Sequence, residues 1–152
     1  MNTQYTISTA ESCTGGNIAH LITMVAGSSS YFKGSVVSYS NEVKINVLGV
    51  PASYINEFGA VSKIVVEAMA IGVRKLMDTD YAVSTSGIAG PDGGSEDKPI
   101  GTIWIAICNR QEVKSRCLHL SGSRIENIKY TSKIVLQWLR DEYNLSLLEG
   151  EQ

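Results

Sequence analysis

Residues 5–16, YTISTAESCTGG, join a predicted strand to a predicted helix, and the rest of the chain can be placed around this junction. The stretch opens as an alternating run in which Tyr5, Ile7 and Thr9 share one face, a pattern typical of a strand. Small polar residues and two glycines follow, and the helical pattern NIAHLITMV begins directly after them. A strand that turns this sharply into a helix leaves the first N–H groups of the helix unpaired, near the end of the strand.

The turn holds three side chains capable of nucleophilic chemistry, Ser12, Cys13 and Thr14. Gly15 and Gly16 allow the backbone to approach a ligand closely, and unpaired N–H groups suit a phosphate or an oxyanion. A simpler interpretation is that Thr14 only caps the helix, that Ser12 closes the turn and that Cys13 is a packing residue. We expect the reactive centre in this turn, and the turn by itself leaves open which side chain attacks.

The composition indicates one globular domain, residues 1–152. Apolar residues make up 43% of the chain and charged residues 18%, which separates it from disordered proteins. The net charge of −2, without a block of lysines or arginines, argues against a nucleic-acid partner. The longest apolar runs fall short of the ~18 residues that a membrane span needs, so we expect no membrane partner.

The cysteines and histidines give little support for a metal site or a disulfide framework. The three cysteines form an odd count without metal-type spacing, and the two histidines lie far apart: Cys13, Cys108, Cys117, His20 and His119. Free cysteines of this kind suit a reducing compartment. We therefore expect a soluble, cytoplasmic domain without a metal.

Hydrophobic periodicity and turn residues divide the chain into alternating strands and helices. After the opening strand they predict a helix at 15–25, a strand at 33–40, a helix capped by Asn41 that stops at Gly49, and a helical turn from Pro51 to about Gly59. A longer helix, capped by Ser62, follows at 63–77. The second half of the chain is predicted to form strands at 80–86, 101–108 and 112–120 and a helix from about Arg124 to Tyr143. The residues from about 144 onward are expected to form a frayed tail.

The order β-α-β-α-α-β-β-β-α predicts the fold class. Helices separate the first three strands, which favours parallel pairing through right-handed crossovers. The last two strands follow each other closely and should form an antiparallel hairpin. We predict an α/β protein, a three-layer α/β/α sandwich with a mixed, mostly parallel sheet of about five strands.

A second cluster of polar residues, YSNEVK at 39–44, follows the second predicted strand. It should lie at the same carboxyl edge of the sheet as the first turn, where open α/β sheets bind ligands. Lys44, one turn into a helix, could act as a general base toward a serine if partly desolvated. The alternatives are a solvated surface lysine, and a Tyr39 that simply packs against the sheet.

Two further clusters are candidates for substrate contacts. Ser86 and Gly87 end the third predicted strand and lead into the loop at 87–101, which has five glycines and two prolines. A loop of this length and composition is typical of a binding loop, although a flexible surface loop has the same composition. Arg124 follows SGS at 121–123 and suits a phosphate or a carboxylate, or equally a surface ion pair.

Taken together, these clusters resemble the C-terminal domain of the competence- and damage-inducible CinA proteins, a family that includes nicotinamide-nucleotide amidases. The resemblance covers about residues 7–140. The matching stretches are AESCTGG (10–16), AGSSSYF (26–32), YSNEVK (39–44), LGV (48–50), GAVS (59–62), AMAIG (68–72), SGIAGPDGGSEDKPIGT (86–102) and SGSR (121–124).

The resemblance implies hydrolysis of the carboxamide of nicotinamide mononucleotide, which gives nicotinic acid mononucleotide and ammonia. It also implies a serine–lysine mechanism without a metal or other cofactor, with Ser12 as the nucleophile and Lys44 as its base. Tyr39, Ser86 and Arg124 would line or polarise the site. The other expected substrate contacts are Thr14, Gly15, Gly16 and Gly87.

Two departures from the family pattern bear on activity. Family members usually carry a helix before the first strand, and only a few residues precede it here, so we expect a partner copy to cover apolar surface in a homo-oligomer. Ser123 stands where the family often has aspartate. Two alternatives therefore stay open: a catalytically silent nucleotide-binding or assembly domain, and a thiol enzyme that uses Cys13.

Overall fold

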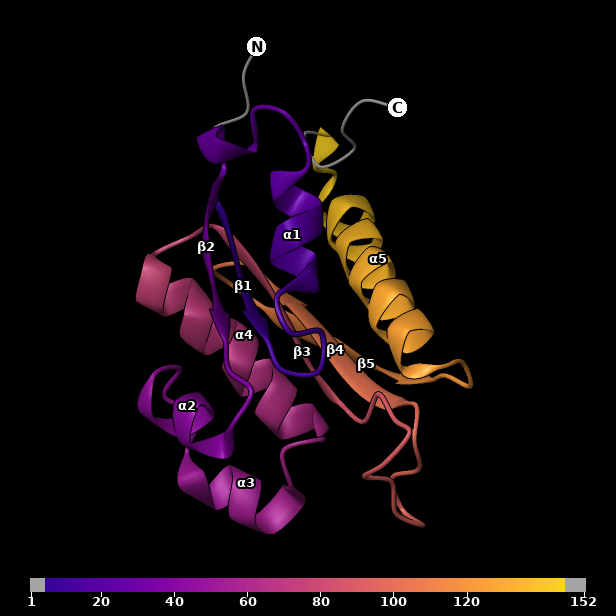
Figure 1. Ribbon diagram of the computed structural model, residues 1–152. Helices are drawn as coiled ribbons and strands as arrows, with labels where there is room; N and C mark the ends of the chain where they lie inside the picture. Colours follow the sequence, from indigo (N-terminus) through magenta and orange to yellow (C-terminus); the bar gives the residue numbers. More distant parts are fainter. Residues whose placement is uncertain (1–4, 147–152) are drawn as a thin grey trace.

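The computed structural model describes residues 5–146 and shows a sheet covered by helices on both faces (Figure 1). The strands are β1 (Ile7–Glu11), β2 (Phe32–Val37), β3 (Tyr81–Gly87), β4 (Thr102–Cys108) and β5 (Val113–His119). The helices are α1 (Asn17–Thr23), α2 (Asn41–Asn46), α3 (Ala52–Phe58), α4 (Lys63–Met77) and α5 (Arg124–Tyr143), with a short 3-10 turn at Ser28–Ser30.

The sheet has the order β2-β1-β3-β4-β5. β1 pairs in parallel with both β2 and β3, whereas β3 with β4 and β4 with β5 pair antiparallel. Within the described sheet β4 is therefore the strand that opposes the common direction of the others. This confirms the predicted three-layer α/β/α class with a mixed, mostly parallel sheet. It also brings the carboxyl ends of β1, β2 and β3 to one edge.

Each face of the sheet has its own apolar core. On one face α1 and α5 pack over isoleucines of β1 and β4, with Ile18, Ile22 and Leu139 buried. On the other face α4 buries Val65, Met69 and others against small residues such as Ala82 and Ala106. Small side chains on that side let α4 approach the strands closely. Apolar burial on both faces is the main stabilising term for such a sandwich.

Several predicted boundaries match, and the predicted cap of α2 is wrong. The helices at 63–77 and at Arg124–Tyr143 begin and end where predicted. Ser40, and not Asn41, caps α2, since its side chain accepts a hydrogen bond from the N–H of Val43. Ser62 is the N-cap residue of α4, as predicted, but its hydroxyl donates to the carbonyl of Gly59 and makes no capping hydrogen bond to the helix.

The predicted frayed tail is also wrong where the structure describes it. Leu145 lies in the core and its N–H donates to the carbonyl of Arg140 after the left-handed Asn144. Residues 147–152, the rest of that predicted tail, lie outside the described residues. Among residues 5–146 no helix is long and apolar enough to cross a membrane.

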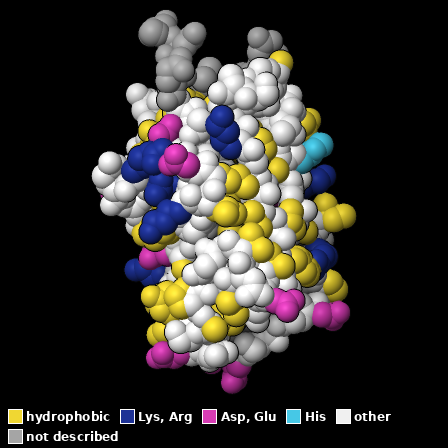
Figure 2. Space-filling model, turned by 90° about the vertical axis from the view of Figure 1, so that its left-hand side faces the viewer, with side chains coloured by type: hydrophobic (Ala, Val, Ile, Leu, Met, Phe, Trp, Pro, Cys, Tyr) yellow, Lys and Arg dark blue, Asp and Glu magenta, His cyan; other side chains and the backbone are white. Residues whose placement is uncertain are grey.

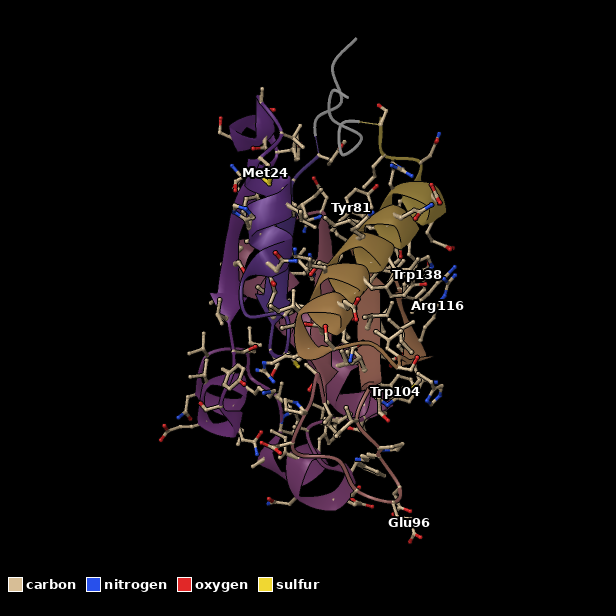
Figure 3. The ribbon with its side chains drawn as sticks, turned by 45° about the vertical axis from the view of Figure 1, so that its right-hand side comes forward. Met24, Tyr81, Glu96, Trp104, Arg116 and Trp138 are labelled. Atoms are coloured by element: carbon tan, nitrogen blue, oxygen red, sulfur yellow. The ribbon has the colours of Figure 1, made fainter. Side chains whose placement is uncertain are left out.

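Side chains of β5 and α5 meet near the far edge of the sheet. The Arg116 guanidinium lies over the ring of Trp138, 4.0 Å from its centroid, and Figure 3 shows the two side chains together at this edge. Such a cation–π contact covers an edge strand without exposing apolar surface. The polar clusters of the carboxyl edge lie elsewhere, where β1, β2 and β3 end.

Candidate active site at the carboxyl edge of the sheet

Ser12 and Lys44 meet at the carboxyl edge of the sheet. Ser12 directly follows β1, and Lys44 lies in α2, which begins just beyond the end of β2. The distance between Lys44 Nζ and Ser12 Oγ is 3.0 Å, within hydrogen-bond range. The Lys44 side chain is only 1% exposed and Ser12 8%. The parallel pairing of β1 and β2 thus brings together two residues that lie far apart in the sequence.

The amine of Lys44 is surrounded by hydrogen-bond acceptors. Nζ donates to the carbonyl oxygens of Ser38 at 2.8 Å and Tyr39 at 3.1 Å, and to Ser12 Oγ at 3.0 Å. If Nζ loses a proton, it can keep the two carbonyl bonds, and its lone pair then faces the hydroxyl of Ser12. Burial lowers the pKa of Lys44, and none of the ion pairs found among residues 5–146 involves this lysine. The alternative of a solvated surface lysine is therefore wrong.

A cavity of about 290 Å³ opens above this pair. It is lined by Ser12, Cys13, Tyr39, Asn41, Lys44, Ala60, Val61, Ser86, Gly87, Ile88, Ala89, Asp92, Gly93 and Arg124. Residues 87–93 of the glycine-rich loop therefore contribute to the wall. Figure 3 shows Glu96 farther along the same loop, directed away from the rest of the molecule.

Four of the predicted substrate contacts, Tyr39, Ser86, Gly87 and Arg124, lie in this wall. Ser86 Oγ donates to the carbonyl of Ala60 at 2.8 Å. Arg124 donates to the carbonyl of Gly90 at 2.7 Å and lies 3.3 Å from the hydroxyl of Tyr39. Arg124 thus joins the glycine-rich loop to the segment after β2, across the cavity.

The other three predicted contacts, Thr14, Gly15 and Gly16, are not part of the cavity wall. Thr14 is buried, and its hydroxyl donates to Glu11 at 2.8 Å and lies 2.9 Å from the hydroxyl of Thr85. The N–H of Gly16 donates to the Glu11 carboxylate at 3.0 Å. The glycines instead allow the tight turn, since both have positive φ angles.

Glu11 is the residue that sequence reasoning missed. Its side chain is fully buried and accepts hydrogen bonds from the N–H groups of Gly16, Ile18 and Ala19 at 3.0, 2.9 and 2.8 Å. It therefore caps α1 from outside the helix, and these N–H groups are not free for a phosphate. A charged residue between a strand and a turn is typical of an exposed position, so its burial could be recognised only from the three-dimensional fold.

Asn41 and Asp92 were also missed as members of the cavity wall. Asn41 was interpreted as a helix cap, and Asp92 belongs to the loop that was predicted to bind without individual assignments. In the sequence, the only indication that these two residues belong to the site was their position close to the motif residues Tyr39 and Gly93. Both place amide or carboxylate groups where a polar ligand would meet them.

Ser123, which replaces the family's frequent aspartate, caps α5. Its hydroxyl accepts from the N–H of Glu126, and the Glu126 carboxylate accepts from the N–H of Ser123, which together form a capping box. Serine and aspartate are both favoured at this position. The substitution therefore preserves the start of the helix that carries Arg124.

Cys13 is poorly suited to attack. Its thiol is buried, and burial raises the pKa of Cys13 to about 11, since the thiolate would lose hydration. Ser12, with a lysine amine at hydrogen-bond distance, has the more favourable surroundings. No group of His, Cys, Asp or Glu within residues 5–146 is arranged to hold a metal ion.

A larger cavity, about 600 Å³, lies beside α4 and is lined by residues such as Leu48, Tyr54, Glu67 and Lys75. It contains no serine or cysteine. The size of a cavity is therefore a poor guide to the active site in this molecule. Of these two cavities, the smaller one, above Ser12, is the one lined by serines and a cysteine.

The fold and this site define an α/β/α protein with a buried serine–lysine pair at the carboxyl edge of its sheet. A family model described as the CinA C-terminal domain matches residues 1–143. The chain belongs to the CinA C-terminal domain family.

Curated relatives and solved structures agree with this assignment. CinA-like proteins of Cytophaga hutchinsonii and Shewanella woodyi are 52% and 51% identical, over 89% and 93% of this chain. The chain spans only 32% and 34% of their length. The crystal structure of competence damage-inducible protein A from Klebsiella pneumoniae superposes with a TM-score of 0.90 at 32% identity, covering 93% of this chain and 88% of that one.

A second solved structure, a competence/damage inducible protein from Agrobacterium tumefaciens, has a TM-score of 0.89 at 37% identity and covers 91% of this chain and 85% of that one. Both crystallised proteins thus share the fold over nearly their whole length.

Proposed function

We propose that this chain is a nicotinamide-nucleotide amidase, which hydrolyses the carboxamide of nicotinamide mononucleotide to nicotinic acid mononucleotide and ammonia. The observation that supports the proposal best is the 3.0 Å distance between Lys44 Nζ and Ser12 Oγ, both buried. Membership of a family that includes such amidases suggests the substrate. No metal or cofactor takes part in the proposed reaction.

The proposed reaction has two halves. Ser12 Oγ attacks the carboxamide carbon while neutral Lys44 takes the hydroxyl proton, and the tetrahedral intermediate collapses as Lys44 returns that proton to the departing ammonia. Water then attacks the acyl-Ser12 ester with Lys44 again as the base, and Lys44 passes the proton to the departing Ser12 Oγ, which restores the serine and releases the acid product. The two backbone carbonyls that hold Nζ keep the amine in place throughout.

We propose that Arg124, Tyr39 and the loop wall bind the rest of the mononucleotide. Arg124 is the guanidinium in the cavity wall, and its charge suits the phosphate of the substrate. The amide of Asn41 and the carboxylate of Asp92 suit ribose hydroxyls. Ser86 and Gly87 would form the wall beside the carboxamide.

The direct test is ammonia release from nicotinamide mononucleotide by the wild type and by Ser12→Ala and Lys44→Ala. We expect loss of turnover in Ser12→Ala and a reduction of about 10²–10⁴-fold in Lys44→Ala, since a positioned general base contributes that much. Circular dichroism of each variant verifies the fold. Full activity of either variant would refute the serine–lysine mechanism.

The same assay addresses the alternative of a silent binding domain. Because the curated relatives are about three times longer than this chain, the domain could serve them as a binding module. Calorimetric binding of the mononucleotide by wild-type protein without ammonia release would favour that alternative. Steady turnover would exclude it.

A further inference from the structure

Glu11 is a buried carboxylate that the proposed mechanism does not use. Its Oε1 accepts from Thr14 Oγ1 and from the N–H groups of Gly16 and Ile18, at 2.8–3.0 Å. Its Oε2 accepts from the N–H of Ala19 at 2.8 Å, with the hydroxyls of Thr9 and Ser35 at 3.2 and 3.4 Å. The three backbone partners are donors only, which is the arrangement that a carboxylate requires.

These bonds enclose the turn that carries Ser12. The segment from Ser12 to Gly16 leaves β1 after Glu11 and returns to the Glu11 carboxylate through Thr14 and Gly16. Within the turn, the N–H of Gly15 donates to the carbonyl of Ser12. The N–H of Ser12 itself donates to the carbonyl of Thr85 at 3.1 Å, and the rest of the turn is tied to the Glu11 side chain, which also holds the N-terminus of α1.

The main chain of Glu11 is also connected to Lys44, through hydrogen bonds of Ser38. The N–H of Ser38 donates to the Glu11 carbonyl at 2.8 Å. The carbonyl of Ser38 in turn accepts from Lys44 Nζ at 2.8 Å. Glu11 thus connects to the nucleophile through its side chain and to the lysine through its main chain.

We propose that Glu11 is a positioning residue, which holds Ser12 in line with Lys44 without touching the substrate. Hydrogen bonds to a buried carboxylate are strong, and a low-dielectric site penalises any arrangement that leaves this group unpaired. The turn is therefore held in one geometry before substrate arrives. This inference rests on the proposed role of Ser12 as the nucleophile.

The test uses the reactivity of Ser12 toward a fluorophosphonate, which needs no substrate. Ser12 Oγ attacks phosphorus, fluoride leaves, and Lys44 takes the proton, so labelling measures the same activation as catalysis. The maximal labelling rate and the half-saturating reagent concentration are measured by intact-mass spectrometry for wild type, Glu11→Gln and Ser8→Ala. Peptide mapping verifies that the label is on Ser12.

Ser8→Ala is the matched control. Ser8 is buried in the same strand, but its hydroxyl bonds to Thr79 and to the carbonyl of Val73 on the α4 side. Its removal should lower stability without altering the turn. Glutamine in place of Glu11 keeps the size of the side chain but turns one acceptor oxygen into a donor that faces N–H or O–H groups.

We expect Glu11→Gln to lower the maximal labelling rate about tenfold or more, because small displacements of reacting groups are costly, with an unchanged half-saturating concentration. Ser8→Ala should stay within about twofold of wild type. An undiminished rate in Glu11→Gln, or an equal loss in both variants, would overturn the proposal. Absence of Ser12 labelling in wild type would contradict the proposed function and this inference with it.

If Glu11→Gln fails to fold, the labelling rate of Thr14→Val is measured in its place. It removes the hydroxyl that bonds to Glu11 Oε1 and to Thr85, from a buried residue outside the cavity wall. We expect a smaller decrease of about two- to fivefold in the maximal labelling rate, since the backbone N–H bonds to the carboxylate remain. A rate equal to that of wild type would overturn the proposal.

Discussion

At the scale of single residues, the proposed chemistry depends on the protonation of Lys44. A lysine in water is almost fully protonated near neutral pH, since its ordinary pKa is about 10.4. Burial lowers the pKa of Lys44, because the ammonium form loses its hydration. The neutral amine, which is the form that can accept the Ser12 proton, is therefore present at lower pH than it would be on the surface.

The first prediction follows from the sign of this shift. kcat/KM for ammonia release should rise as the pH increases, in step with the neutral fraction of Lys44, and level off below pH ~10.4. The measurement is a pH–rate profile on protein verified to be folded at each pH. Lys44→Arg is the control, since a guanidinium stays protonated throughout. A rise that continues through the ordinary lysine pKa would contradict the prediction.

Sequence reasoning identified Ser12 and Lys44, the serine and lysine that lie 3.0 Å apart, but not the groups that hold them in place. Ser12 and Lys44 lie in motifs whose places at the ends of β1 and β2 follow from the strand pattern. The three acceptors around the site, the carbonyls of Ser38 and Tyr39 and the carboxylate of Glu11, become visible only in three dimensions. The direction of a backbone carbonyl leaves no pattern in the sequence. The burial of a single carboxylate leaves none either, because periodic patterns appear only when many residues share one face.

At the scale of elements, the position of α2 depends on α4. Leu48 follows α2, and its N–H donates to the carbonyl of Val43, while the N–H of Val50 donates to that of Lys44. A Cβ added to Gly72 of α4 would lie 2.1 Å from the carbonyl oxygen of Leu48. The glycine therefore allows the segment that carries Lys44 to lie directly on the backbone of α4.

The second prediction concerns this contact. Gly72→Ala should displace the segment after α2, destabilise the protein by about 1–3 kcal/mol, and reduce kcat through the altered position of Lys44. Thermal unfolding and ammonia release measure the two effects. Leu76→Ala, an exposed position one turn further along α4, should stay within about 0.5 kcal/mol of wild type. Wild-type stability and activity in Gly72→Ala would contradict the prediction.

The strand and helix pattern was the most predictable part of this molecule. α4 and α5 have long amphipathic repeats with clear stops, so their limits were predicted correctly. Adjacent cap candidates such as Ser40 and Asn41 have similar propensities, and only the backbone geometry distinguishes them. Leu145 was predicted to fray because the helix ends before it, whereas its burial against the core comes from packing.

At the scale of the whole molecule, one face carries several exposed apolar side chains; others, such as Ile125 and Tyr130 of α5, lie elsewhere. Figure 2 shows this face, on the side where β2, α2 and α4 lie, and Val37, Val47 and Leu76 of these segments are about half exposed. We propose that this chain forms a homo-oligomer, for which such a face is suited. Ser12, Lys44 and Arg124, the groups on which the proposed reaction depends, nevertheless all lie in the same chain around one cavity.

The third prediction separates assembly from catalysis. Specific activity should stay constant over a hundredfold dilution, because one chain supplies Ser12, Lys44 and the cavity wall. Light scattering at the same concentrations reports any dissociation. A loss of activity that parallels dissociation would show that a second copy completes the site.

The place of β1 in the sheet has a consequence for how the protein folds. β1 lies between β2 and β3, and Ile7 pairs with Tyr81, far away in the sequence. Contacts of such long range form slowly, because the intervening chain must first be ordered. The pairing of β1 with β2 brings Ser12 to Lys44, and the N–H of Ser12 donates to the carbonyl of Thr85 in β3, so the complete site needs both neighbours of β1. The return of serine reactivity after dilution from denaturant should therefore report the final long-range step of folding.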